Sequence, residues 1–297
     1  MKKIIFTLLI LLPINVFAKV NVVTTTPDLA AIAREVGGVL VDVKSIARGD
    51  QNPHYLEPKP SFILLVNKAD LLIEVGLELE VGWLPVLLTQ SRNPKIQRGN
   101  PGHLSASEGL RILEIPTGPI DRSQGDTHPE GNPHYWLHPA NGIKIAQNIA
   151  ARLGQIDPTN KSAYEQNTSQ FVSRLQRKIT GWKNSSAGFR GKKIVTHHKS
   201  FSYFVDFTGL TVVDFVEPKP GIPPPPSHIM SLMDRIRKDK IPLIITENYY
   251  DTQAAKEIAR KTGIKALVLA SSVGGAPGVN TYEALFDYLI GEIKNNL

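Results

Sequence analysis

Cysteine is absent from the 297 residues of this chain. Without it no disulfide can form, no lipid can be attached to a cysteine at a signal-peptide cleavage site, and zinc sites built from thiolates are excluded. A metal site in this chain must therefore use histidine, aspartate or glutamate side chains. The H-E-x-x-H pattern of many zinc hydrolases is also missing, which argues against that class of enzyme.

Long apolar runs are missing after residue 18, so we expect no membrane-spanning helix in the body of the chain. The first 18 residues, MKKIIFTLLILLPINVFA, combine two lysines with an apolar stretch and a final small residue, the pattern of a cleaved signal peptide. The alternative is an uncleaved N-terminal anchor, but Pro13 interrupts a stretch shorter than the ~20 residues of a spanning helix. We expect residues 1–18 to be removed and the rest to be soluble in the periplasm of a two-membrane bacterium.

A one-sided charge distribution is lacking as well. The formal net charge is +7, but the basic residues are scattered and interleaved with aspartate and glutamate. We interpret this pattern as a solvated surface and expect no nucleic-acid partner. No internal repeat at the spacing of solenoid proteins is visible.

What the chain does contain is an alternation of short β-branched runs with helical patterns. In the first half the expected strands are 20–25, 40–46 and 70–76, and the expected helices begin at Pro27 and Pro60. In the second half the expected strands are 192–198, 211–218, 242–247 and 264–270. This rhythm is typical of parallel sheets covered by helices. The fold-class prediction is α/β, with an N-terminal lobe at 19–156 and a C-terminal lobe at 185–297.

A single long helix is predicted between the lobes, at residues 157–184. Asp157 is its expected N-cap, and Pro158 occupies the first helical position. One apolar stripe at spacings of three and four is formed by Tyr164, Thr168, Phe171, Leu175, Ile179 and Trp182. A helix of this length spans roughly 37 Å at 1.5 Å per residue. It suits a rigid connector, although an ordinary surface helix within one domain is the alternative.

Histidine is concentrated at a few places. The stretch GDTHPEGNPHYWLHP, residues 125–139, holds three of the eight histidines, namely His128, His134 and His138. The tripeptide Asn-Pro-His occurs twice, ending at His54 and at His134. Proline fixes its own φ and restricts the residue before it, which holds the following imidazole in place. The tripeptide therefore favours His54 and His134 as metal ligands over the alternative of ordinary polar loop residues.

The other histidines divide into a pair and two isolated residues. His197 and His198 end the expected strand 192–198, and because adjacent strand residues point to opposite faces, at most one should join a shared site. His103 is interpreted as a loop residue and His228 as the start of a helix. Neither is expected to bind metal.

Six segments in order resemble a known family. They are NPHYLEPKPS, ADLLIEVGLELE, GNPHYWLHP, VTHHKSFSYF, VEPKPG and ASSVGGAPG. Together they resemble the metal-binding substrate-binding proteins of bacterial ABC transporters, the zinc and manganese group. The resemblance implies two α/β lobes joined by one long stiff helix, with the metal in the cleft between them. It implies His54, His134 and His198, rather than His197, as ligands.

The fourth ligand is where the chain departs from the family. Many members have an aspartate in the C-terminal lobe, and the corresponding stretch here, LASSVGG, contains Ser271 and Ser272 but no carboxylate. Glu247, at the end of the strand 242–247, is the candidate by location. Glu57 and water are the alternatives, and a purely structural role for Glu247 is open. His128 is a candidate for collecting or relaying metal, and the part played by His138 is open.

Three neutral imidazoles suit Zn²⁺ better than Mn²⁺, which prefers carboxylate oxygens, although copper and nickel also accept imidazole. Affinity is expected to fall as the pH approaches the imidazole pKa of ~6.5. Each ring also needs a carboxylate or carbonyl to accept from its second N–H. Tyr55, Glu57 and Trp136 are expected neighbours of the rings, and the sequence does not assign their contacts.

The expected function is therefore Zn²⁺ capture by a monomer and delivery to the membrane permease of an ABC transporter. Alternatives are a manganese-binding member of the same family, a zinc hydrolase with Glu130 or Glu247 as base, and a surface adhesion protein. We expect no enzyme.

Overall fold

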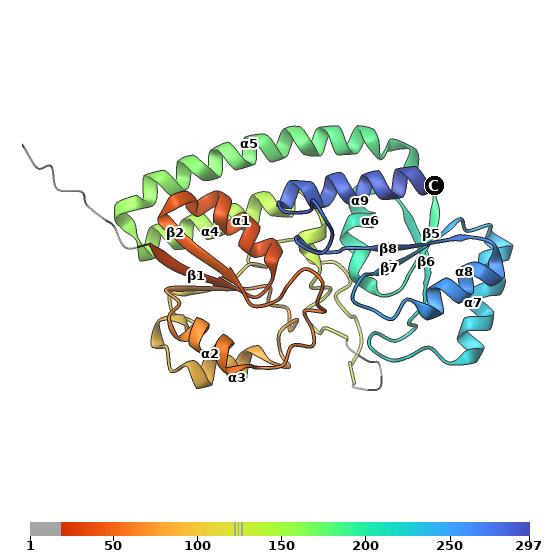
Figure 1. Cartoon of the computed structure of the whole chain (residues 1–297), viewed down its shortest axis with the longest axis horizontal. Helices are drawn as coiled ribbons and strands as arrows, with labels where there is room; N and C mark the ends of the chain where they lie inside the picture. The colour runs from red at the N-terminus through yellow and green to blue at the C-terminus, as the bar shows by residue number, and fades with distance from the viewer. Residues whose placement is uncertain (1–18, 122, 124, 126) are drawn as a thin grey trace, which may run out of the picture.

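The computed structural model describes residues 19–121, 123, 125 and 127–297. The predicted signal peptide, residues 1–18, lies outside the described residues. Within the described part, eight strands form two sheets of four, which lie at opposite ends of the long axis in Figure 1. No helix in the described ranges has both the length and the apolar character needed to cross a membrane.

The first sheet has the strand order β2-β1-β3-β4, with every neighbouring pair parallel. Its strands are β1 (Val20–Thr24), β2 (Val41–Ser45), β3 (Leu71–Glu74) and β4 (His103–Ser105). The helices of this half are α1 (Pro27–Gly37), α2 (Pro60–Asn67), α3 (Leu84–Ser91) and α4 (Asn141–Ile156). The three predicted strands and both predicted helix starts are confirmed, and β4 is a strand that the sequence did not predict.

The second sheet has the order β6-β5-β7-β8 and is also parallel throughout. Its strands are β5 (Lys193–Thr196), β6 (Thr211–Phe215), β7 (Leu243–Glu247) and β8 (Lys265–Leu269). The helices of this half are α6 (Ser202–Thr208), α7 (Pro226–Asp239), α8 (Gln253–Thr262) and α9 (Tyr282–Asn296). All four predicted strands are confirmed, each slightly shorter than its apolar run.

The central strands β1, β3, β5 and β7 are mostly buried on both faces, as their apolar runs require, whereas the edge strands β6 and β8 are partly exposed. Along β1, Val22 enters the largest core cluster, whereas its neighbour Val23 enters a smaller cluster beneath α2 and α3. In the second sheet, Ile245 belongs to the largest cluster and Ile244 to a third one beneath α7 and α8. The largest cluster therefore runs from one sheet to the other through α1, α4, α5 and α9, and it joins the two lobes.

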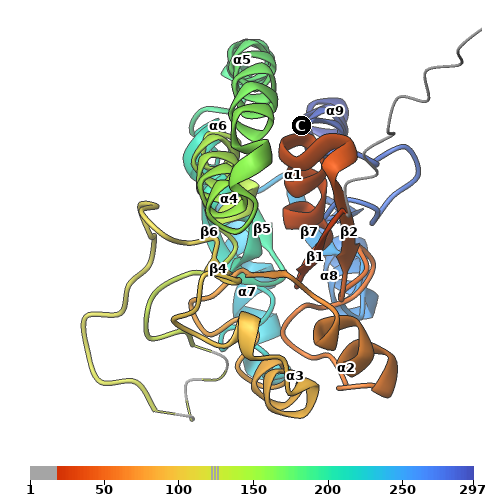
Figure 2. The same cartoon turned by 90° about the vertical axis from the view of Figure 1, so that its left-hand side faces the viewer.

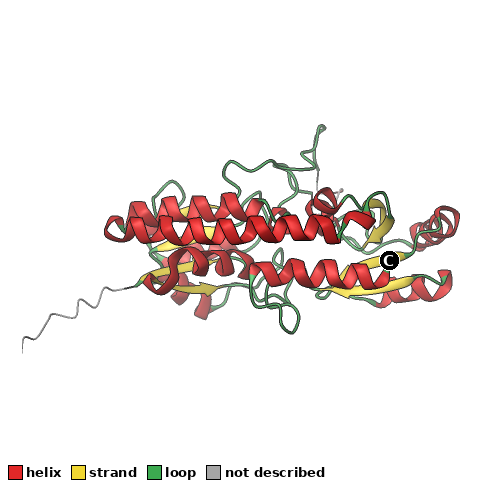
Figure 3. Ribbon diagram, turned by 90° about the horizontal axis from the view of Figure 1, so that it is seen from above, coloured by secondary structure: helices red, strands yellow, loops and turns green. Residues whose placement is uncertain are grey.

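The long helix α5 (Lys161–Ser185) lies along one side of both lobes, over α1, α4 and α9 (Figures 1 and 3). Seen end-on in Figure 2, it forms the outermost layer on this side. Its predicted apolar stripe faces the core: Tyr164, Thr168, Phe171, Leu175 and Trp182 are buried, and Ile179 packs against them. The long helix predicted from this stripe is confirmed, and 25 residues form its regular part.

The start of this helix differs from the prediction. A 3₁₀ turn, Pro158–Asn160, precedes α5, so the helix begins at Lys161. Asp157 makes no side-chain bond to a backbone N–H. Its Oδ2 instead accepts hydrogen bonds from Asn160 Nδ2 at 2.7 Å and from Tyr164 Oη at 2.6 Å. Asp157 therefore holds the turn by bonding to side chains. The residue type alone predicts an N-cap and cannot tell this contact from a bond to a backbone N–H.

Charged groups on α5 hold helices of both lobes. Arg174 pairs with Glu35 of α1 at 2.6 Å and with Glu283 of α9 at 2.8 Å. Trp182 Nε1 donates to Asp287 Oδ1 of α9 at 2.8 Å. Exposed ion pairs are individually weak, but here they join elements already packed in one core. The arrangement restrains α5 against both lobes at once.

The lobes also meet at the first turn of α1. Asp28 Oδ1 accepts a hydrogen bond from the backbone N–H of Val273 at 2.9 Å. Gly49 lies against the same segment, and a Cβ at this position would come within 2.2 Å of Val273 O. Asp28 is fully buried, and this burial raises the pKa of its carboxyl to about 7.

Asp28 is expected to make the stability of the protein pH-dependent. A folded-state pKa of about 7 against ~3.9 in the unfolded chain means that the native state binds more protons in between. Stability should therefore fall as pH rises from about 4 to 7, by at most about 1.4 kcal/mol per unit for this group. Asp28→Asn should remove this contribution. As pH rises, the free energy of unfolding of the variant should therefore increase relative to that of wild type. Urea titrations from pH 4.5 to 8 measure this difference.

Asp42→Asn, at an exposed position of β2, is the matched control because it removes a charge without removing a buried one. The interpretation fails if the Asp28→Asn and Asp42→Asn curves run parallel to wild type across this range.

Candidate metal centre

Three segments from different parts of the chain place histidines between the lobes. His54 lies in the loop that follows β2, and His134 directly precedes a 3₁₀ turn at Tyr135–Leu137. His198 comes two residues after β5, before a 3₁₀ turn at Lys199–Phe201. Positions beyond the carboxyl ends of parallel strands are where open α/β sheets bind ligands. All three side chains are buried, with exposed fractions of 5 % or less.

The structure brings these three histidines together. One ring nitrogen from each lies within 4.8 Å of the other two, and among the described residues this is the one such group of three or more His, Asp or Glu side chains. The ring centroids of His54 and His134 are 5.1 Å apart, and that of His198 lies 5.7 and 5.6 Å from them. Since zinc–imidazole bonds are ~2.0–2.1 Å long, one ion could contact all three after small adjustments.

Both Asn-Pro-His elements use the asparagine to orient the imidazole. Asn52 Oδ1 accepts hydrogen bonds from the backbone N–H of His54 at 3.0 Å and from its Nδ1 at 2.8 Å. Asn132 Oδ1 does the same for His134, at 2.9 Å in each case. Because an amide oxygen only accepts, each Nδ1 must carry the proton and each Nε2 the lone pair. The rings are thus held in the tautomer that binds a metal through Nε2.

Asparagine holds these ring N–H groups, a contact that the sequence left unassigned. Of the expected neighbours, Tyr55 lies beside His54 and Trp136 beside His134, with ring centroids 5.9 and 5.3 Å apart. The repeated Asn-Pro-His tripeptide is the feature of the sequence that indicates this role. The loop geometry adds a second constraint: Gly131, before Asn132, has φ 101°, and a Cβ there would come within 2.8 Å of Leu113 O. Only glycine readily takes that conformation.

Two buried tryptophans fix the histidine loops. Trp83 Nε1 donates to Pro53 O at 2.9 Å, directly before His54. Trp136 Nε1 donates to Ser271 O at 2.9 Å and so joins the His134 segment to the other lobe. These bonds limit the freedom of the loops, and the Trp136 ring also lies against that of His134, with centroids 5.3 Å apart.

His198, and not His197, belongs to the group of three. His197 turns away and stacks on Tyr250, with ring centroids 4.5 Å apart and planes 19° from parallel. Glu217 lies beneath both, 3.4 Å from His197 Nε2 and 3.5 Å from His198 Nδ1. Although burial opposes it, contact with these two imidazoles lowers the pKa of Glu217 to about 2. A carboxylate beside the Nδ1 side of His198 favours metal binding through its other nitrogen.

Burial also keeps the first two imidazoles neutral. It lowers the pKa of His54 and of His134 well below the usual histidine value, and the charges of neighbouring histidines add to the effect. Protons therefore compete less strongly with a metal for these two side chains than they would for a free histidine.

Glu247 is the last residue of β7 and is fully buried. Its carboxylate does not join the three histidines within the 4.8 Å spacing. Burial raises the pKa of Glu247, against the opposing effect of His198 nearby. Glu57 is exposed, and Ser271 and Ser272 are buried without supplying a carboxylate. For a fourth protein ligand to be present among the described residues, a side chain such as Glu247 would have to move closer to the three rings.

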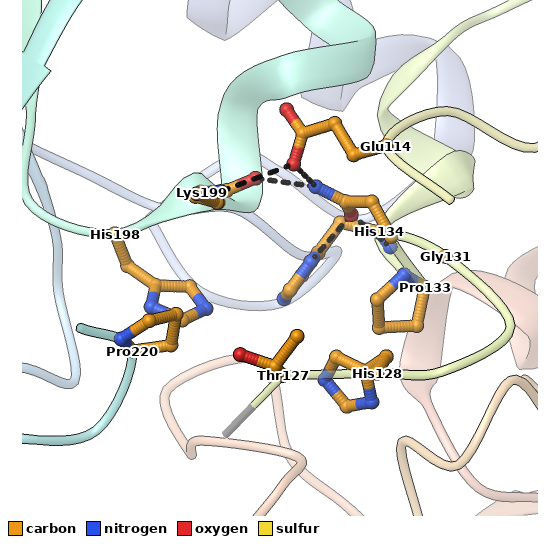
Figure 4. Close-up of a pocket in the computed structure, with 10 residues that line it drawn as sticks. Glu114, Thr127, His128, Gly131, Pro133, His134, His198, Lys199 and Pro220 are labelled. Carbon is orange, nitrogen blue, oxygen red and sulfur yellow. Dashed lines mark hydrogen bonds and ion pairs between the residues drawn. The ribbon is translucent and has the colours of Figure 1, made fainter. Parts of the chain in front are cut away.

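Two further histidines of the 125–139 stretch behave differently. His128 lies over His54, with ring centroids 5.3 Å apart, and lines a small cavity of about 50 Å³ beside His134 and His198 (Figure 4). His138 instead packs on Phe207, with centroids 5.4 Å apart, and accepts a hydrogen bond from the Ala140 N–H. His128 borders the candidate site, and His138 does not.

The interpretation of His103 as a loop residue was wrong. It begins β4, is 7 % exposed, and places Nε2 3.1 Å from Glu74 Oε1. Although burial opposes it, Glu74 raises the pKa of His103. The contact between His103 and Glu74 depends on β4 lying beside β3. A strand of three residues is too short for the sequence to predict this neighbour. His228 lies in the first turn of α7, as expected.

Comparison with known proteins settles the family. The sequence pattern described as "ZnuA: Zinc-uptake complex component A periplasmic" matches residues 22–296. This chain belongs to the ZnuA family. Similar curated proteins include the metal ABC transporter substrate-binding lipoprotein ScbA of Streptococcus cristatus, 29 % identical over 289 residues that cover 94 % of this chain and 89 % of ScbA. The manganese ABC transporter substrate-binding lipoprotein PsaA of Streptococcus pneumoniae is 28 % identical over 288 residues, covering 94 % and 89 %.

Solved structures agree on the ZnuA-family fold. A crystal structure of ZnuA superposes with a TM-score of 0.78 at 22 % identity and covers 94 % of this chain and 99 % of its own. A mutant periplasmic metal-binding protein from Candidatus Liberibacter asiaticus with manganese bound has a TM-score of 0.76 at 21 % identity, covering 94 % and 100 %. The two-lobe α/β fold is confirmed. Members of the ZnuA family are substrate-binding proteins and not enzymes, so the hydrolase alternative is excluded.

Proposed function

We propose that this ZnuA-family protein captures Zn²⁺ in the periplasm and delivers it to the permease of a metal ABC transporter. The observation that carries the proposal is the group of three buried imidazoles whose nitrogens lie within 4.8 Å of one another. Uncharged imidazoles suit zinc, whereas Mn²⁺ prefers carboxylate and water oxygens. His54, His134 and His198 are the proposed ligands, and Glu247, Glu57 or water completes the coordination. Residues 1–18 direct export and are then removed, and the mature protein acts as a monomer.

The residues suit capture and release. Asn52 and Asn132 present two Nε2 lone pairs before metal arrives, so little ordering remains to be done on binding. The long helix α5 is tied to α1 and α9 by Arg174. A connector restrained in this way favours small movements of loops over wide hinge opening.

Manganese is the second candidate, and both the relatives and the position of Glu247 favour it. PsaA of Streptococcus pneumoniae carries manganese in its name, and one structural relative holds manganese. Glu247 lies buried near His198 and would supply an oxygen ligand if the site closed around it.

A competition titration of the metal-free mature chain separates the two metals. The dissociation constant for Zn²⁺ should be at least about 100-fold below that for Mn²⁺, a difference of ~2.7 kcal/mol. Equal or tighter Mn²⁺ binding would overturn the zinc assignment and identify carboxylates as the ligands that decide selectivity. No binding of either ion would overturn the metal-capture proposal itself.

A further inference from the structure

The two Asn-Pro-His elements are alike locally but differ in their outward bonds. The side-chain NH₂ of Asn132 donates to Lys199 O at 2.8 Å and lies 3.3 Å from Glu114 Oε2. Its backbone carbonyl accepts a hydrogen bond from Tyr203 Oη at 2.9 Å. Lys199 directly follows His198, and Tyr203 belongs to α6. Asn132 therefore touches His134 on one side and the segment that carries His198 on the other.

Asn52 has no such connection. Its Oδ1 holds His54, and its backbone oxygen accepts a hydrogen bond from the Tyr55 N–H. Within the part of the chain that the structure describes, no hydrogen bond of Asn52 reaches the second lobe. The chain thus contains two equivalent ring-holding asparagines, of which one also bonds across the site.

Glu114 anchors the cross-lobe contact. Its Oε1 accepts a hydrogen bond from Ser202 Oγ at 2.7 Å, while Oε2 faces Asn132 Nδ2. Glu114 has φ 56°, a left-handed conformation that is unfavourable for residues other than glycine. Strain of this kind persists where surrounding bonds over-determine the position. Figure 4 shows Glu114, Lys199 and His134 gathered at this point, beside the cavity that His128 and His198 also line.

We infer that Asn132 is a positioning residue that couples the two halves of the metal site, setting His134 with its amide oxygen and the His198 segment with its amide NH₂. The inference rests on the proposed metal-binding function. It follows that the two asparagines respond differently to aspartate, which keeps the accepting oxygen but replaces the NH₂ with a second oxygen. At position 52 the carboxylate still accepts from His54. At position 132 it faces Lys199 O and the Glu114 carboxylate, both of which repel it, and the half-exposed Lys199 ammonium, 4.0 Å from Glu114 Oε2, offsets this repulsion only weakly.

Cobalt(II) is the probe for the test, because its visible absorption reports the geometry of its ligands. Metal-free wild type, Asn52→Asp and Asn132→Asp are titrated with Co²⁺, and the thermal unfolding of each metal-free variant is recorded. We expect Asn132→Asp to bind Co²⁺ about 10–100-fold more weakly with an altered spectrum, the usual effect of disturbing a residue that orients a ligand. Asn52→Asp is the matched comparison: its carboxylate still accepts from His54, so its loss of affinity should be at least about threefold smaller than that of Asn132→Asp.

A second substitution tests the mechanism. In Asn132→Asp with Glu114→Gln, the new amide can donate to the new carboxylate while its oxygen still accepts from Ser202. At least half of the lost affinity, on a logarithmic scale, and the wild-type spectrum should return. If Asn132→Asp fails to fold, Asn132→Ala and Asn52→Ala replace the two aspartate variants. Asn132→Ala should then bind Co²⁺ at least about tenfold more weakly than Asn52→Ala, because it alone loses the bond across the site.

If wild type binds Co²⁺, three outcomes overturn the inference and leave the proposed function intact. Both aspartate variants could lose affinity equally, neither could lose affinity, or Glu114→Gln could fail to restore the affinity of Asn132→Asp. Failure of wild type to bind Co²⁺ and Zn²⁺ overturns the proposed function, and the inference with it.

Discussion

Replacing His134 by alanine is expected to lower the affinity of the protein for Zn²⁺ by more than about 100-fold. Loss of a residue that merely orients a metal ligand typically costs 10–100-fold, and removal of the ligand itself should cost more. His134 is 1 % exposed, and its Nε2 is held toward His54 and His198 by the bond from Nδ1 to Asn132. The two imidazoles that remain, those of His54 and His198, offer the ion one nitrogen ligand fewer.

His138→Ala is the control for this substitution, because His138 belongs to the same stretch but packs on Phe207 outside the group of three. Isothermal titration with a competing chelator measures both variants. His138→Ala should bind like wild type. The assignment of His134 is wrong if its alanine variant binds zinc within about threefold of wild type while remaining folded.

Replacing Trp136 by alanine is expected to destabilise the metal-free protein by about 3–5 kcal/mol. The indole is 1 % exposed and lies in the core that both lobes share. Truncation removes its packing, opens a cavity and leaves Ser271 O without the hydrogen bond from Trp136 Nε1. Since that bond joins the His134 segment to the C-terminal lobe, the substitution should also weaken zinc binding.

Trp136→Phe separates the two contributions, because it keeps most of the packing and loses the bond. Its expected cost is about 1–3 kcal/mol, the penalty for a buried acceptor left unsatisfied together with the smaller ring. Urea unfolding at pH 7.5 without metal provides the comparison. A cost below 1 kcal/mol for Trp136→Ala would contradict the role of this residue as a link between the lobes.

The strands and the long helix were predictable because they depend on local patterns. Parallel strands buried on two faces read as continuous apolar runs, and one stripe of residues from Tyr164 to Trp182 indicated a single face of α5. The strand β4 was not predicted because three residues are too few to show the alternation or apolar run of a strand. Its His103 was misread for the same reason, since the pairing with Glu74 exists only when β3 and β4 lie side by side.

The candidate site was predictable in part. A repeated tripeptide and the family resemblance singled out His54, His134 and His198, and the structure brings their nitrogens together. The roles of the asparagines depend on hydrogen bonds such as that from Asn132 to Lys199, which are 67 residues apart in the chain. No local pattern reports such a contact. The fourth ligand, whether Glu247, Glu57 or water, stays a prediction, because sequence spacing says nothing about how closely β7 approaches the three rings.

The most direct test of the account is the metal content of the mature protein purified from its bacterial host without added metal. Elemental analysis would compare wild type with the triple variant His54→Ala, His134→Ala, His198→Ala. The account predicts about one zinc ion per wild-type chain and none in the triple variant. Wild type that folds normally but contains no metal, or a triple variant that keeps its zinc, would contradict the assignment of these three histidines as the metal site.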